Sequence, residues 1–345
     1  MSGAIRFRST RKVAWLHDPR RNFELAGIES EVRFDPLTGD SSRVCHFAFP
    51  KRELPDLTAL AQRTREGCPF CPENVERVTP RYPEELIAGG RMKRGEAVLA
   101  PNLFPYDDVS AIIVMSREHW LPTDRFPPGL IADAIILARD FIARTRSALA
   151  GRDAYGIVTW NYMPPAGASQ VHPHLQVIVT DAPGNALKRE LDAEAAFLAA
   201  GDGAYPELLL EAERGGERWL AEDGGVAWWV PWSPLGILGA AQAVFTRAAT
   251  LTDCKDSEIH AFAGFLSRLL RAYVALGLWS FNLTFLPDAE GERSGRHRLV
   301  ARMLPRLYLH PHLYNSDNAY LQLLLGEKFA MVSPEHHAAE LRARL

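Results

Sequence analysis

The segment from His172 to Gln176 carries the side chains best suited to covalent chemistry in this sequence. It reads His-Pro-His-Leu-Gln and leads into the apolar run Val177-Ile178-Val179, which is typical of a buried strand. Since side chains alternate along an extended segment, His172, His174 and Gln176 would share one face. A neutral imidazole attacks phosphorus near neutral pH without a second base. We therefore expect His174 to be a phosphorus nucleophile.

The residue that follows on the same face, Gln176, indicates what the attack would lead to. An amide donates and accepts hydrogen bonds, but it cannot protonate a leaving group or activate water as a further histidine would. The sequence therefore favours group transfer over hydrolysis. The alternative, two ordinary histidines beside a buried strand, is disfavoured by a cysteine pair upstream.

That pair is Cys68-Pro69-Phe70-Cys71, and it could form half of a tetrahedral metal site. Zinc takes four such ligands, and His119 and His172 are the natural sources of the other two. We expect one zinc ion per chain. A redox pair and a structural disulfide stay open as alternatives, although residues 1–16 contain several basic side chains and no continuous apolar core that would indicate secretion.

Several segments, in this order, resemble the galactose-1-phosphate uridylyltransferase family of the histidine-triad superfamily. They are DPLTG (35–39), CPFCPEN (68–74), SREHW (116–120), GASQVHPHLQ (167–176) and the C-terminal stretch from Tyr308. The resemblance implies a homodimer that binds a nucleotide-sugar and a phosphorylated acceptor. It also implies site roles for a set of residues: zinc on Cys68, Cys71, His119 and His172; nucleotidylation of His174; phosphoryl contacts from Gln176; phosphate or ribose contacts from Asn161 and Ser169, with backbone donors near Gly167; and a nucleoside contact from Asn102.

The sequence also departs from the family pattern. Asn102 is followed by Leu103 where the family has an aspartate, which puts uridine specificity in doubt. Gln322, Glu327 and Lys328 stand where the family holds its hexose phosphate. A site built to hydrogen-bond one sugar rejects others, because buried polar groups are then left unpaired. We therefore expect an acceptor other than galactose 1-phosphate.

A second metal site in the family is matched only in part. Glu190, His310 and His312 correspond to three of its four ligands, while residues 280–285 contain no histidine for the fourth. We favour the alternative in which His310 and His312 are hydrogen-bonding residues near a dimer contact. The second metal is therefore left open.

Composition limits the remaining classes of function. The chain has 345 residues, 47% of them hydrophobic, and a formal net charge of −3, which argues against nucleic-acid binding driven by bulk charge. The apolar run 130–137 is interrupted by Asp133, so no membrane span is expected. Cytoplasm is the expected compartment.

The elements predict an α+β fold of two fused histidine-triad-like halves, with mainly antiparallel sheets flanked by helices. We place an N-terminal half at 1–200, with the zinc and the nucleophile, and a non-catalytic C-terminal half at 201–345 that shares one continuous sheet with it. Helices are expected at 128–148, 186–200 and 256–276, and strands at 111–115, 156–160, 226–230, 281–286 and 307–310. Residues 288–298 are expected to form a solvated polar loop.

These features indicate a nucleotidyltransferase that acts through a covalent nucleotidyl-histidine on a ping-pong route. Three alternatives stay open. One is a nucleoside-diphosphate-sugar phosphorylase that uses an adenine nucleotide with phosphate as acceptor. Another is a nucleotide hydrolase. The third is a non-catalytic, zinc-stabilised binding protein.

Overall fold

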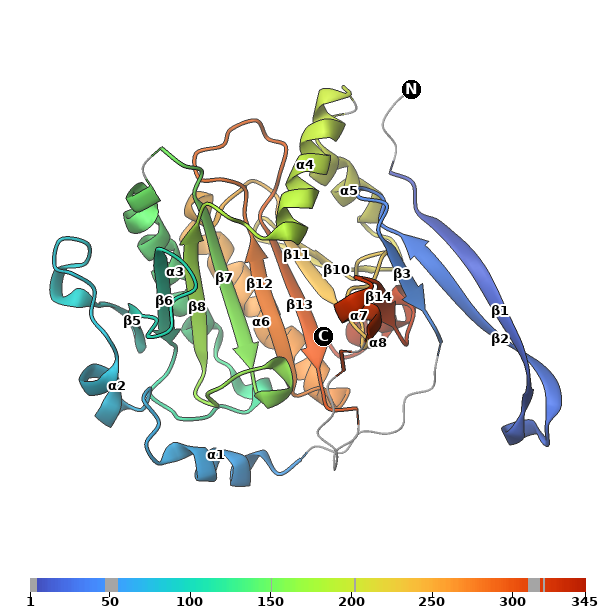
Figure 1. Ribbon diagram of the computed structural model, residues 1–345, viewed down its shortest axis with the longest axis horizontal. Helices are drawn as coiled ribbons and strands as arrows, with labels where there is room; N and C mark the ends of the chain where they lie inside the picture. Colours follow the sequence, from blue (N-terminus) through green and yellow to red (C-terminus); the bar gives the residue numbers. More distant parts are fainter. Residues whose placement is uncertain (1–4, 47–54, 150, 202, 310–316, 319) are drawn as a thin grey trace.

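A ten-stranded antiparallel sheet forms the centre of the molecule (Figure 1). The computed structural model describes residues 5–46, 55–149, 151–201, 203–309, 317–318 and 320–345. The strand order across the sheet is β4-β5-β6-β8-β7-β12-β13-β11-β10-β9. These strands are β4 (Met92–Arg94), β5 (Ala97–Pro101), β6 (Val109–Val114), β7 (Tyr155–Tyr162), β8 (His174–Thr180), β9 (Trp219–Asp223), β10 (Val226–Trp229), β11 (Ala241–Phe245), β12 (Ser280–Leu286) and β13 (Val300–Arg306).

The sheet consists of two five-stranded halves that repeat one plan. From the centre outward, the spatial orders are β7-β8-β6-β5-β4 and β12-β13-β11-β10-β9. Along the chain, each half has a long helix after its third strand, between β6 and β7 in the first half and between β11 and β12 in the second. These helices are α3 (Pro128–Thr145) and α6 (Asp256–Ala275). The halves meet where β7 pairs with β12, so one sheet is continuous across both, as expected. The α+β prediction is confirmed, whereas the boundary at residue 200 stays a prediction.

The two long helices pack against each other over one face of the sheet and bury the main core (Figure 1). Ile131, Ile135 and Phe141 of α3 are fully buried, as the spacing of apolar residues in the sequence predicts. A close approach to the sheet depends on Gly156 of β7, where a Cβ atom would lie 2.5 Å from Cγ2 of Ile142. Burial of each large apolar side chain contributes about 1.5–3 kcal/mol to folding.

A second, four-stranded sheet joins the two ends of the chain. It consists of β1 (Arg8–Asp18), β2 (Glu24–Phe34), β3 (Ser41–Val44) and β14 (Lys328–Ala330), with β14 parallel to β3. The β1–β2 ribbon extends away from the main sheet (Figure 1). The shorter helices are α1 (Leu57–Arg65), α2 (Pro72–Val78), α4 (Asn185–Ala199), α5 (Tyr205–Glu213), α7 (Tyr320–Leu324) and α8 (Pro334–Arg342), with 3₁₀ turns at 19–21, 88–90, 123–125, 146–149, 164–166 and 251–253. In the described part of the chain, no helix has the length and apolarity needed to cross a membrane.

The last strand of the main sheet lies earlier than predicted. We expected a strand at 307–310, but β13 ends at Arg306, and His310 lies outside the described residues. The segment was missed because β13 carries Arg302 and Arg306 on one face, so that it looks like part of a polar loop. Its other face buries Ala301 and Met303 in the main core.

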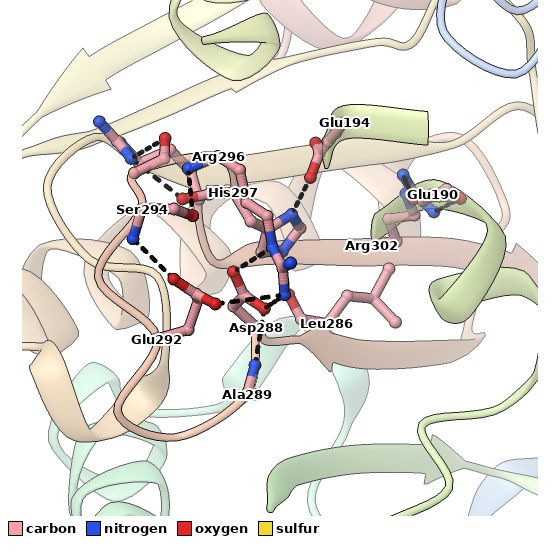
Figure 2. A network of polar contacts seen from close by, with 12 residues as sticks. Glu190, Glu194, Leu286, Asp288, Ala289, Glu292, Ser294, Arg296, His297 and Arg302 are labelled. Carbon is pink, nitrogen blue, oxygen red and sulfur yellow. Dashed lines mark hydrogen bonds and ion pairs between the residues drawn. The ribbon is translucent and has the colours of Figure 1, made fainter. Parts of the chain in front are cut away.

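The prediction of a solvated loop at 288–298 is also wrong in part. Asp288 and His297 are almost completely buried. Nδ1 of His297 lies 2.6 Å from a carboxylate oxygen of Glu194 on α4, and Nε2 lies 3.0 Å from the carbonyl oxygen of Leu286. Figure 2 shows His297 between these two partners. Arg296 donates to the Asp288 carboxylate at 2.7 Å. The charged residues of this loop therefore attach it to α4 and to the end of β12.

Candidate functional site

Four buried side chains from three segments of the chain converge beside the start of β8. Cys68 precedes α2, Cys71 is the residue before its first turn, His119 follows β6, and His172 precedes β8. Their ligand atoms all lie within 4.8 Å of one another. The cysteines are free thiols, so no disulfide joins them.

The distances within this cluster fit a tetrahedral ion. Nδ1 of His172 lies 3.7 Å from Sγ of Cys68 and 3.8 Å from Sγ of Cys71, and Nδ1 of His119 lies 3.5 Å from Sγ of Cys71. Zinc bond lengths of about 2.3 Å to sulfur and about 2.0–2.1 Å to nitrogen correspond to sulfur–nitrogen separations of roughly 3.6 Å in a tetrahedron. The residues therefore fit one metal ion.

The far nitrogen of each imidazole is held by a neighbouring group. Nε2 of His172 lies 2.9 Å from the carbonyl oxygen of Ser116 and must donate to it. Nε2 of His119 lies 3.1 Å from Oγ1 of Thr64, which itself donates to the Leu60 carbonyl oxygen. Both rings therefore carry their proton on Nε2 and direct the Nδ1 lone pair at the thiols, which is the arrangement a metal-binding histidine requires.

Burial sets the protonation of the cluster. It lowers the pKa of His172 to about 4 and also lowers the pKa of His119, so both rings are neutral near pH 7. Burial and the nearby Cys68 thiol raise the pKa of Cys71 to about 12. A cation bound among these four ligands would supply the positive charge that such a thiolate needs.

His174 is the first residue of β8 and is oriented by its own chain. Its Nδ1 lies 2.8 Å from the carbonyl oxygen of His172, so Nδ1 carries the proton and Nε2 carries the lone pair. The side chain is 5% exposed, and burial lowers its pKa, which keeps the ring neutral. The ring of Phe70, from the CxxC segment, packs at 5.0 Å between ring centroids. Among the described residues, the Nε2 lone pair is therefore the one available to a ligand.

A polar row crosses the face of the sheet opposite α3 and α6, beside His174. Gln176 pairs with Thr159 of β7, Thr159 pairs with Thr284 of β12, and Thr284 pairs with Arg302 of β13. Asn161 lies two residues from Thr159 and so shares this face with Gln176 and His174. The predicted residues Gln176, His174 and Asn161 are thus brought together.

The phosphate-binding segment expected before β8 forms an exposed turn. Gly167 has φ of +79°, a conformation that favours glycine, and it ends the 3₁₀ turn at Pro164–Ala166. Gly167 and Ser169 are both exposed. The Gly167 N–H donates to the Pro164 carbonyl oxygen at 2.9 Å, so the exposed Ser169, with its hydroxyl, is the residue of this turn that offers donors to a ligand.

Asn102 lies at the end of β5, in a connection that bears exposed apolar side chains. Its N–H donates to the Ser110 carbonyl oxygen at 3.0 Å, and its side-chain oxygen accepts from the N–H of Phe104. Leu103 is 64% exposed and Phe104 is 77% exposed. No carboxylate stands at position 103, where the family pattern has an aspartate.

The residues assigned to a second metal do not form a described cluster. Both carboxylate oxygens of Glu190 accept from Arg302 at 2.8 Å (Figure 2). Burial opposes ionisation of Glu190, but Arg302 outweighs it and lowers the pKa of this carboxyl. His310 and His312 lie outside the described residues. The second metal therefore stays open.

Two of the three residues that differ from the family pattern near the C-terminus, Glu327 and Lys328, lie at the smaller sheet. Glu327 accepts a hydrogen bond from Ser41 at 2.9 Å and pairs with Arg43 at 3.3 Å. Lys328 is the first residue of β14, and burial lowers its pKa. Gln322 belongs to α7.

Sequence reasoning missed the partners that hold the site residues. Thr64 and Ser116 orient His119 and His172. In the second half, Asn282 donates to Asn161 and accepts from Arg306. In the sequence, residues 280–285 stand out only as the place of a fourth ligand for the second metal, and they contain no histidine. No signal in the sequence marks Asn282, because its contact with Asn161 depends on the antiparallel pairing of β12 with β7.

Known proteins support this fold. No family model matches the chain. An uncharacterized protein of Archaeoglobus fulgidus is 30% identical over 315 residues, which are 90% of this chain and 91% of that protein. A solved uridylyltransferase mutant has a TM-score of 0.67 and 17% identity and covers 91% of this chain and 97% of its own. A galt-like protein of Arabidopsis thaliana has a TM-score of 0.69 and 16% identity, with 91% and 99% covered.

A third solved structure, an ADP-glucose phosphorylase of Arabidopsis thaliana with bound ADP-glucose, has a TM-score of 0.68 and 16% identity. It covers 91% of this chain and 98% of its own. The chain belongs to one family with the Archaeoglobus protein, and it shares the fold of the solved uridylyltransferase and of the galt-like protein. The resemblance in the sequence is thus confirmed at the level of the fold.

Proposed function

We propose that the protein is a nucleotidyltransferase that moves a nucleoside monophosphate from a nucleotide-sugar to a sugar 1-phosphate or a related phosphorylated acceptor. The observation that carries the proposal is the orientation of His174. Its Nδ1–H is committed to the His172 carbonyl oxygen, which leaves Nε2 as a neutral nucleophile. The solved relatives are a uridylyltransferase and an ADP-glucose phosphorylase, which agrees with this chemistry.

The transfer takes two steps. Nε2 of His174 attacks the α-phosphorus, a P–N bond forms, and the bond from phosphorus to the bridging oxygen breaks with departure of the sugar phosphate. An oxygen of the acceptor then attacks the same phosphorus, and the P–N bond breaks to return the lone pair to Nε2. Each step inverts the phosphorus, so the net outcome is retention.

Charge on the phosphoryl oxygens is met by donors of the same sheet face. We assign this role to Gln176, Asn161 and Ser169, together with backbone N–H groups near Gly167, while Asn102 lies at the nucleoside. Zinc on Cys68, Cys71, His119 and His172 would hold the CxxC segment and His172 in place and, with four protein ligands, would have no open coordination position. We also propose that the enzyme is a homodimer and that residues 1–200 form the catalytic half.

A phosphorylase that cleaves an adenine nucleotide-sugar with inorganic phosphate is the second candidate. Leu103 favours it, because an exposed apolar side chain stands where the family has an aspartate in the nucleoside segment. The two functions share the first step and differ only in the acceptor, so one experiment addresses both.

The test is mass spectrometry of the intact protein incubated with UDP-, ADP-, GDP- or dTDP-glucose in the absence of acceptor. We expect one of the four to add one nucleoside monophosphate, acid-labile and located on the peptide that contains His174. Adding phosphate or a hexose 1-phosphate should then remove the label and identify the acceptor.

The His174→Asn variant should show no adduct, and His336→Asn, which changes an exposed histidine on α8, should label like the natural protein. An adduct on another residue, or no adduct with any of the four donors, would contradict the proposed function.

A further inference from the structure

A chain of hydrogen bonds runs from the second half of the protein into the catalytic half. Nε of Arg306 donates to both carboxylate oxygens of Asp317, at 2.9 and 2.8 Å, and its Nη1 donates to Oδ1 of Asn282 at 2.6 Å. Nδ2 of Asn282 donates to Oδ1 of Asn161 at 2.6 Å and to the carbonyl oxygen of Ala166 at 2.9 Å. Asp317 is 4% exposed, and the other side chains are half-buried.

Each link in this chain has only one possible direction. A guanidinium has no acceptor, so Arg306 forces the oxygen of Asn282 toward itself. The amide nitrogen of Asn282 must then face Asn161, which can meet it only with its own oxygen. Nδ2 of Asn161 is left as the end of the chain, and within the described residues it donates to no other group.

We propose that the second half sets Asn161 as a hydrogen-bond donor for the transferring phosphoryl group, with Asn282 and Arg306 as positioning residues. The inference rests on the proposed function. Asn161 lies on the face that carries His174 and Gln176, and the same amide of Asn282 holds the carbonyl oxygen of Ala166 directly before Gly167. One side chain of the second half therefore orients both the donor and the turn that leads to Ser169.

The alternative orientation of Asn161 would oppose the reaction. With its amide reversed, Oδ1 would face the negative phosphoryl oxygens, and an acceptor against an acceptor is repulsive. Asp317 balances the charge of Arg306, so the chain fixes this orientation without adding net charge beside the site.

The test is the isosteric variant Asn282→Asp. A carboxylate still accepts from Arg306 but cannot donate to Asn161, so Asn161 must turn its nitrogen toward the new carboxylate and its oxygen toward the phosphate. We expect the single-turnover rate of His174 labelling, with whichever of the four glucose nucleotides labels the natural protein, to fall about 100-fold, the usual effect of losing one such donor. Ser280→Ala is the matched control. It removes a 2.8 Å bond from the same strand to the carbonyl oxygen of Tyr162 but leaves the Asn161 amide in place.

A double-mutant cycle separates positioning from general damage. In the Asn161→Ala background there is no amide left to orient. Adding Asn282→Asp there should therefore lower the rate of His174 labelling by less than about threefold. An equal loss in both backgrounds, or labelling of Asn282→Asp at the rate of Ser280→Ala, would overturn the inference while leaving the proposed function intact. A natural protein that none of the four donors labels would overturn the proposed function, and this inference with it.

Two variants of Arg306 test the same orientation of Asn282 if Asn282→Asp does not fold. Arg306→Lys preserves a group that only donates, whereas Arg306→Met removes the donor and lets the Asn282 amide reverse. We expect labelling to be at least about tenfold faster in Arg306→Lys than in Arg306→Met. Equal rates would contradict the inference.

Discussion

Nδ1 of His297 lies 2.6 Å from a carboxylate oxygen of Glu194, and both side chains are buried. The pair joins the loop after β12 to α4, the helix that also carries Glu190 (Figure 2). Burial alone would lower the pKa of His297, but the Glu194 carboxylate outweighs it and raises that pKa. Burial raises the pKa of Glu194. The folded pair therefore retains a proton that the unfolded chain releases as pH rises.

This pair predicts a pH dependence of stability. A raised histidine pKa contributes stability that is fully present below the unfolded value of about 6.5 and is lost as pH rises through the folded value. Between pH 6 and pH 9, the free energy of unfolding should fall more steeply for the natural protein than for the double variant Glu194→Gln/His297→Gln, in which neither group titrates. Urea unfolding across this range measures both slopes, and parallel curves would refute the assignment.

Metal content is a second prediction. Elemental analysis of the purified protein should find about one zinc ion per chain, because the four ligand atoms match a tetrahedral site. Cys68→Ser should lose the metal and lower the melting temperature, since three segments of the chain would no longer be held together. Cys45→Ser, which changes a half-buried cysteine outside the cluster, serves as the control and should keep its zinc. Unchanged zinc in Cys68→Ser would exclude this ligand set.

Acceptor choice is a third prediction. Glu327 is occupied by Ser41 and Arg43, and Lys328 lies in β14. We therefore expect weak or no turnover of UDP-glucose with galactose 1-phosphate, well below the typical enzyme kcat of roughly 10 per second. Steady-state assays with this pair, beside phosphate and other hexose 1-phosphates, measure the difference. A kcat near the typical value on galactose 1-phosphate would show the prediction to be wrong.

The packing of α3 on the sheet gives a fourth prediction. Gly156→Ala should destabilise the protein by about 1–3 kcal/mol, because the new Cβ would lie 2.5 Å from Cγ2 of Ile142. Gly129→Ala is the control. That position lies in the first turn of α3, a Cβ there meets open space, and alanine should leave stability unchanged or raise it by up to about 1 kcal/mol. Chemical denaturation compares the two variants, and equal stabilities would contradict the close contact.

The sequence by itself determined the features that depend on short stretches of chain, namely individual strands, helices and the cysteine pair. The run that becomes β8 and the spacing of Cys68 and Cys71 are visible locally, because strand alternation and metal-ligand spacing are short-range properties. The long helices α3 and α6 were likewise predicted nearly to their ends, since their apolar residues recur with the period of a helix. The duplicated plan and the continuous sheet followed from the order of these elements.

Only the tertiary structure decided which distant polar side chains meet. His297 was expected in solvent because its neighbours are charged, yet Glu194 compensates its burial. Asn282 carried no signal, because its role depends on the register that places β12 beside β7 and brings Arg306 within reach. The His297–Glu194 and Asn282–Asn161 bonds join residues 103 and 121 positions apart, and neither composition nor periodicity encodes which donor will face which acceptor.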